Sequence, residues 1–117
     1  NFIHGVSPER LVHSYSSSSI AVVPSIYEGF GLPAAEAMAC SIPVISTDGG
    51  ALPEIVGEAG LIVPVKDSEA IACEIQKLLE NKSLREDLGK AGRKRIKENF
   101  SWDITANKVA LLYQKII

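Results

Sequence analysis

Glu28 and Glu36 are the residues whose types and spacing most favour chemistry, because they are two carboxylates separated by only seven residues. A Gly29-Phe30-Gly31 turn and Pro33, a residue favoured in the first turn of a helix, lie between them. The apolar run of residues 20–23 comes shortly before this segment. A strand, a glycine-bearing loop and a helix N-terminus in that order predict a site for a phosphorylated ligand, because unpaired backbone N–H groups and the helix dipole attract anions.

Each residue of this segment has an expected role and a simpler alternative. Gly29 and Gly31 let the backbone approach a ligand that a Cβ would exclude. Glu36, about one turn into the helix, offers its carboxylate to two adjacent hydroxyls such as those of a ribose. Taken singly, Glu36 could instead stabilise the helix dipole, Glu28 could be a solvated loop charge, and Phe30 could be a core anchor. The combination of these features favours a binding site.

Short apolar runs predict the strands that must position this segment. Their hydrophobicity is continuous rather than alternating, which indicates strands buried on both faces, as in a parallel sheet. We therefore predict an α/β fold with a Rossmann-like parallel sheet of about four strands and flanking helices, half of a doubly wound sheet. Ligands of such sheets bind at the carboxyl ends of the strands, where loops 24–32 and 47–50 are expected to emerge. The runs are residues 2–4, 20–23, 44–46 and 61–63.

Proline and capping residues predict where the helices begin and end. Three helices are expected between the strands: from Ser7-Pro8 to about Ser16, from Pro33 to near Cys40, and a short one from Pro53 to Gly57.

Three more helices are expected after Pro64, so that the C-terminal region is helical. Asp67 or Ser68 caps the first, a capping box at residues 83–86 starts the second, and Ser101 caps the third. Each helix carries an apolar stripe that we expect to face the core. The stripes are Ile71, Ile75, Leu78 and Leu79; then Leu84, Leu88, Ala91 and Ile96; and last Trp102, Ala106, Val109, Leu112, Tyr113 and Ile116.

Length and composition are those of one globular domain of 117 residues. No segment is apolar over the roughly 18 residues that a membrane span needs, and no signal peptide is recognised. Cys40 and Cys73 match no metal-ligand spacing, which suggests free thiols in a reducing compartment and a cytoplasmic location. The first residue is Asn1 rather than Met, so we expect a piece of a longer protein.

Charge is distributed unevenly along the chain. Residues 1–65 hold one basic residue against six acidic ones, whereas residues 66–117 hold eleven against eight. The basic run at residues 90–97 leaves two interpretations open: a solvated helix face, which the flanking acids favour, or peripheral contact with an anionic membrane surface. No aromatic residues are interleaved with it, so nucleic acid is not an expected partner.

Residues 20–66 resemble the family-4 retaining glycosyltransferases of the GT-B fold. The likeness rests on the Glu–seven residues–Glu motif within residues 27–40, and it continues through residues 43–47, 49–56 and 60–64 to the Phe100-Ser101-Trp102 step. It covers nearly the whole chain. Ser41 departs from the family pattern, in which a glycine is usual, and we expect this to alter a turn rather than the site.

The resemblance implies that residues 1–117 are the C-terminal nucleotide-sugar-binding domain, truncated on its N-terminal side and lacking the acceptor domain. Glu28 would be the catalytic residue in contact with the transferred sugar, and Glu36 would bind the ribose. Backbone N–H groups of residues 30–32 (Phe30, Gly31 and Leu32) would hold sugar hydroxyls and a phosphate oxygen, while Gly5 and Val6 would lie beside the base. The reaction would transfer a sugar from a nucleotide diphosphate to an acceptor with retention of configuration.

The same resemblance implies no metal and no cofactor, because cationic side chains and helix N-termini stabilise the leaving diphosphate in such enzymes. Residues 1–65 contain only one cation, Arg10, so we expect the chain alone to be inactive and at most a weak nucleotide binder. The expected partners are the nucleotide sugar, an acceptor glycan or lipid of polysaccharide or glycolipid biosynthesis, and a second copy across the exposed site face. The alternatives are a non-catalytic binding or assembly module and a GT-B nucleotide-sugar epimerase.

Overall fold

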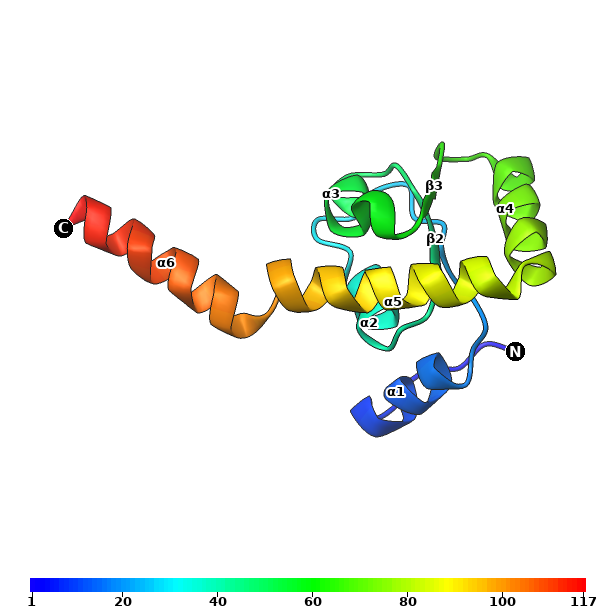
Figure 1. Ribbon diagram of the computed structural model, residues 1–117, viewed down its shortest axis with the longest axis horizontal. Coiled ribbons are helices and arrows are strands. Elements are labelled where there is room, and N and C mark those ends of the chain that lie inside the picture. Colours follow the sequence, from blue (N-terminus) through cyan, green and yellow to red (C-terminus); the bar gives the residue numbers. More distant parts are fainter.

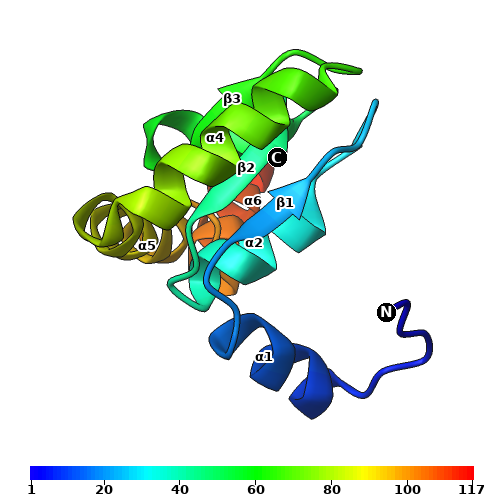
Figure 2. The same ribbon diagram turned by 90° about the vertical axis from the view of Figure 1, so that its right-hand side faces the viewer.

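The computed structural model describes residues 1–117 as a three-stranded parallel sheet with helices around it (Figure 1). The strands β1 (Ala21–Val23), β2 (Val44–Thr47) and β3 (Leu61–Val63) pair in the order β1-β2-β3. They run side by side in the same direction (Figure 2), with Val22 opposite Ile45 and Ser46 opposite Ile62. All four residues of β2 are buried, because it is the central strand and helices pack against it. The predicted parallel α/β sheet is therefore confirmed.

The strand expected at residues 2–4 is absent. These residues have no regular secondary structure, and Phe2 is 97% exposed. A three-residue run can be ordered as a strand only if a paired neighbour supplies ladder hydrogen bonds, and no strand pairs with β1 on its outer side. The sheet of this chain consequently has three strands rather than about four.

Six α-helices and one 3₁₀ turn (Gly57–Ala59) complete the fold, and most begin where capping residues predict. Side chains of Ser7, Asp67 and Ser101 each accept a hydrogen bond from the first turn of the following helix. The expected capping box at residues 83–86 is wrong. Asn81 caps that helix by accepting a hydrogen bond from the Leu84 N–H at 2.9 Å. The helices are α1 (Pro8–Ser16), α2 (Leu32–Ala39), α3 (Leu52–Val56), α4 (Ser68–Glu80), α5 (Lys82–Asn99) and α6 (Trp102–Ile116).

Helix α2 lies at the centre of the core, between the sheet and α5. Met38 of α2 is fully buried. Helix α5 approaches Met38 through Gly92 and Ser41 through Gly89, whereas the expected contact residue Ala91 is exposed. A Cβ at Gly89 would collide with the Ser41 carbonyl oxygen. The core comprises Val23, Ala34, Ala35, Ala37, Met38, Ile42, Val44, Leu52, Ile55, Val56 and Ala59.

Helix α6 differs most from expectation, because it projects away from the sheet (Figure 1) and buries none of its residues. Trp102 is 88% exposed and Ile116 is 71% exposed, so the prediction that the α6 stripe faces the core is wrong. Leu79 at the end of α4 is likewise exposed. Periodicity shows that residues share a face, but no element of this chain covers the apolar face of α6. None of the helices has the length and apolarity needed to cross a membrane.

Candidate functional site

Two loops meet at the carboxyl edge of the sheet, the place where the sequence predicts the site. The loop after β1 and the loop after β2 are tied together by the Ala51 N–H, which donates to the Glu28 carbonyl at 2.8 Å. The Thr47 hydroxyl also donates to the Ser25 carbonyl. Gly50 has a φ of +59°, and a Cβ there would collide with the Glu28 backbone. The second loop thus fixes the backbone that carries Glu28.

Glu28 is half-buried, and its carboxylate is oriented by a neighbour in the same loop. The Ser25 hydroxyl donates a hydrogen bond of 2.8 Å to Glu28 Oε1. No hydrogen bond from the chain reaches Oε2. The side chain is therefore held on one oxygen and able to accept from a ligand hydroxyl on the other.

The N-terminus of α2 is open to a ligand. Gly31 precedes the helix with a φ of +97°, and no side chain caps this end. A Cβ at Gly31 would lie 2.9 Å from Leu52 Cδ2, so both conformation and packing require glycine there. The N–H groups of Phe30, Gly31 and Leu32 donate to no backbone or side-chain acceptor of the chain. These donors and the positive end of the α2 dipole favour an anion.

Glu36 is half-buried on the second turn of α2 and is held by a residue that sequence reasoning missed. The Tyr15 hydroxyl, from α1, lies 3.3 Å from Glu36 Oε2 and 3.3 Å from the Pro33 carbonyl oxygen, so it can donate to either. Burial raises the pKa of Tyr15 to about 12, with further contributions from the charge of Glu36, its hydrogen bond and Cys40. The phenol therefore stays a donor throughout the physiological range. The sequence offers one indication of this contact. Tyr15 is an aromatic residue with a hydroxyl group, and it lies one turn after Leu11, which is half-buried.

An apolar groove of about 470 Å³ lies beside Glu36. Phe30 is 45% exposed and meets the Phe100 ring edge-on, with centroids 6.1 Å apart, so it is a surface contact rather than a core anchor. The groove is bordered by α2, the end of α5 and the start of α6. Its lining consists of Phe30, Leu32, Ala35, Glu36, Ala39, Ile96, Phe100, Trp102 and Thr105.

The remaining expected residues are less closely tied to the site. Gly29 is exposed, and a Cβ there would meet nothing within 4 Å, so the fold does not require glycine at this position. Gly5 is also exposed, and no backbone hydrogen bond joins residues 1–6 to the site loops. The expected contact of Gly5 and Val6 with a base stays a prediction.

Comparison with known proteins identifies relatives of this chain. A model of the family described as "Glycosyl transferases group 1" matches residues 1–95. An MMP alpha-(1->4)-mannosyltransferase of Mycolicibacterium hassiacum is 39% identical over 116 residues, which is 97% of this chain but only 28% of that protein. The chain therefore spans less than a third of the length of this relative.

Solved structures show the same fold. A sucrose-phosphate synthase from Thermosynechococcus elongatus matches with a TM-score of 0.90 and 41% identity, over 99% of this chain and 30% of that one. The C-terminal domain of a glycosyl transferase group 1 family protein from Francisella tularensis matches with a TM-score of 0.75 and 34% identity, over 87% of this chain and 52% of that one. These likenesses confirm the predicted fold class, an α/β fold that is half of a GT-B fold.

Proposed function

The chain belongs to the glycosyl transferases group 1 family, and from this premise we propose that it forms most of the donor site of a retaining glycosyltransferase. The enzyme would transfer a sugar from a nucleotide diphosphate to an acceptor bound by another part of the protein. One observation supports the proposal most directly. The unpaired N–H groups of residues 30–32 at the α2 N-terminus lie in the same segment as the carboxylates of Glu28 and Glu36, each of which is oriented by a hydroxyl.

Glu36 is proposed to bind the ribose of the donor. A vicinal diol donates two hydrogen bonds, and a carboxylate accepts both when its orientation is fixed. Tyr15 supports that role, because its hydroxyl is within reach of Oε2 and leaves lone pairs on both oxygens for the diol. Tyr15 is in this proposal a positioning residue and touches no substrate.

Glu28 is proposed to contact the sugar that is transferred. The Ser25 hydroxyl fixes Glu28 Oε1, and the loop after β2 fixes its backbone, so the second oxygen can accept from a sugar hydroxyl. A negative charge at this position also stabilises positive charge that develops at the anomeric carbon as the leaving group departs. Neither carboxylate needs to form a covalent bond, so the spacing rules of glycoside hydrolases do not apply.

The leaving diphosphate is proposed to lie at the α2 N-terminus. The N–H groups of Phe30, Gly31 and Leu32 and the helix dipole supply part of the required positive potential. Full stabilisation of a diphosphate needs cations as well. Arg95 is engaged elsewhere, since it donates to the carbonyls of Glu54 and Ile55 at 2.7 Å. We therefore expect the chain alone to bind nucleotide weakly and to be inactive.

The proposal is tested by nuclear magnetic resonance of the chain with UDP, GDP and ADP at millimolar concentration. We expect one of them to bind and Glu36→Ala to weaken it roughly 10- to 100-fold, the range for hydrogen bonds to a charged group. Glu58→Ala, an exposed carboxylate on the 3₁₀ turn, is the control and should leave binding unchanged. Binding that survives Glu36→Ala would contradict the ribose assignment.

Gly29→Ala separates a binding role from a structural one. Because a Cβ at Gly29 meets nothing within the chain, this variant should fold as stably as the wild type. If a ligand approaches this backbone, the same variant should bind nucleotide at least several-fold more weakly. Retention is tested in a protein that joins this domain to an acceptor-binding domain. The anomeric configuration of the product is measured there, and an inverted product would refute that part of the proposal. Binding of nucleotide sugars without transfer by such a protein would indicate a binding module instead.

A further inference from the structure

The basic run of α5 is divided by the fold into two parts. Arg95 turns inward, where it donates to carbonyls at the end of α3 and stacks over the Phe100 ring at 5.9 Å. The other four cations are exposed and recur at positions i, i+3, i+4 and i+7, which places them on one face of the helix. These four residues, Lys90, Arg93, Lys94 and Lys97, are called the α5 stripe below.

The α5 stripe borders a shallow hollow of about 580 Å³ that contains no hydrophobic side chain. Its other lining residues are Ser41, directly after α2, and Glu98. Arg93 is fixed at the inner edge, because its Nη1 donates to the Ala39 carbonyl at 2.8 Å. The hollow is therefore a polar, positively charged surface rather than a pocket for an apolar ligand.

Charge within the α5 stripe is poorly balanced. Glu98 is the only carboxylate that lines the hollow, and Glu98 Oε1 lies 3.9 Å from Lys94 Nζ in an exposed pair that contributes little. Glu86 and Asp87 lie one turn before Lys90 on the same helix, and Glu86 pairs with Lys82 at 3.8 Å rather than with the stripe. Lys90, Arg93 and Lys97 have no carboxylate within 4.0 Å. Like charges at these spacings destabilise a helix, so an external anionic surface would relieve a repulsion that the chain itself leaves.

We propose that the α5 stripe docks this domain on the surface of an anionic phospholipid bilayer. Four cations in a row of roughly 10 Å along one helix present their charge to a plane, and four is the lower end of the basic clusters that bind anionic leaflets. The chain as a whole is acidic, with a net charge of −2, so attraction must come from this local stripe. No apolar side chain in the hollow would insert, so the contact is electrostatic and reversible.

The position of the α5 stripe is compatible with the candidate site. Ser41 in the hollow follows the carboxyl end of α2, whereas the open N–H groups lie at its amino end. A bilayer against the stripe would leave the site loops exposed. The docking proposal goes beyond the proposed function and does not depend on it.

Sedimentation of the chain with lipid vesicles tests the proposal. We expect binding to phosphatidylcholine vesicles that contain phosphatidylserine and none to phosphatidylcholine alone. Binding should be lost in 1 M salt, where the screening length falls to about 3 Å. The variant Lys90→Gln/Lys94→Gln/Lys97→Gln should bind roughly 100-fold more weakly, about 5-fold for each cation removed. Arg93 is left in place because its bond to Ala39 joins α5 to α2.

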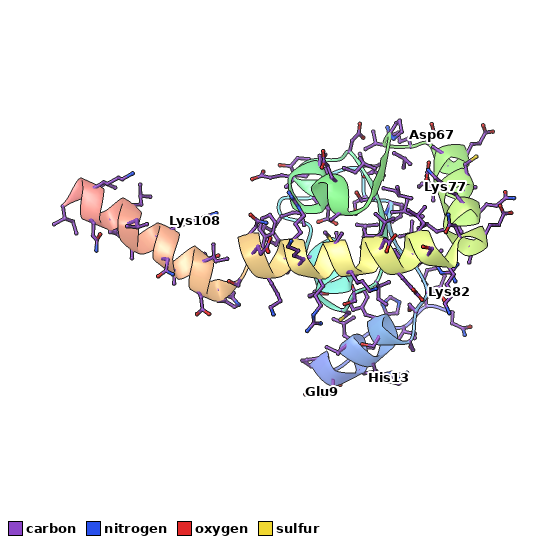
Figure 3. The ribbon with its side chains drawn as sticks, viewed as in Figure 1. Glu9, His13, Asp67, Lys77, Lys82 and Lys108 are labelled. Carbon is purple, nitrogen blue, oxygen red and sulfur yellow. The ribbon has the colours of Figure 1, made fainter.

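A matched control removes the same charge elsewhere. Lys77 and Lys82 lie where α4 meets the beginning of α5 (Figure 3), and Lys66 is exposed in the loop after β3. The variant Lys66→Gln/Lys77→Gln/Lys82→Gln should keep most of the wild-type vesicle binding. Circular dichroism should show that both triple variants are folded.

Three results would overturn the proposal. Equal losses in the two triple variants would show that only net charge matters. Binding to phosphatidylcholine alone, unchanged in the stripe variant, would assign the contact to another surface such as α6. Displacement by millimolar glycerol phosphate would indicate a site for a small anion rather than for a bilayer surface.

Discussion

At the scale of single residues, each of the two carboxylates is associated with one hydroxyl. Ser25 orients Glu28 from three residues away, whereas Tyr15 reaches Glu36 from another helix. The glutamates and their spacing are visible in the sequence. The Tyr15 contact is not, because it depends on how α1 packs against α2.

Tyr15 should make the free energy of unfolding depend on pH in the alkaline range. Its pKa is raised from about 10 to about 12, so the unfolded chain loses this proton at lower pH than the folded chain. The stabilising contribution is complete below pH 10 and is lost as the pH rises from about 10 to about 12. We expect Tyr15→Phe to lack this part of the pH dependence, as measured by urea unfolding at a series of pH values.

Tyr113→Phe is the control for that experiment, because Tyr113 is 61% exposed on α6. It should retain the wild-type pH profile. If Tyr15→Phe also retains it, the packing of α1 against Glu36 is not maintained in solution.

At the scale of elements, the contact between α2 and α5 determines how the site helix is held. Helical periodicity predicts an apolar stripe of leucine, alanine and isoleucine on α5 and assigns no contact to glycine. In the structure Leu84, Leu88 and Ile96 are half-buried, Ala91 is exposed, and the fully buried residues of α5 are Gly89 and Gly92. At Gly89 the chain after α2 comes too close for a Cβ. Helix propensity alone would predict that both glycines destabilise α5.

Gly89→Ala should destabilise the fold by about 1–3 kcal/mol, the usual effect of overpacking, despite a gain in helix propensity of up to about 1 kcal/mol. A Cβ at Gly89 meets the rigid Ser41 carbonyl, whereas a Cβ at Gly92 lies 3.3 Å from the Met38 side chain, which can shift. Gly92→Ala should therefore be much less destabilising. Urea unfolding of both variants measures the difference, and equal free energies of unfolding would contradict this account of the contact.

At the scale of the whole molecule, the chain is elongated because α6 projects from it. The radius of gyration is 15.4 Å, compared with about 13 Å for a compact domain of this length. The principal extents are 53 × 31 × 30 Å. A 15-residue helix with no fully buried residue is stabilised mainly by its own backbone hydrogen bonds and its Ser101 cap.

Hydrogen exchange should therefore differ sharply along the chain. Amides of β2, all of whose residues are buried, should exchange only on global unfolding, and amides of α6 should exchange many-fold faster. Exchange followed by nuclear magnetic resonance at low protein concentration measures both. Protection of α6 equal to that of β2 would show that its apolar face is covered in solution, as in a dimer.

The sequence by itself determined the features that depend on neighbouring residues. Continuous apolar runs predicted β1, β2 and β3, and the residues Ser7, Asp67 and Ser101 predicted helix starts. Both features depend on residues only a few positions apart in the sequence. The open turn between Glu28 and Glu36 was predictable for the same reason.

Tertiary structure alone decided which faces are covered. A short apolar run predicted a fourth strand at residues 2–4 and periodicity predicted an apolar stripe on α6, and neither is buried in this chain. Periodicity also could not divide the basic run of α5 into an inward Arg95 and an outward stripe. Periodicity states which residues share a face, whereas burial requires a second element to pack against that face, and that pairing is set by contacts between segments distant in the sequence.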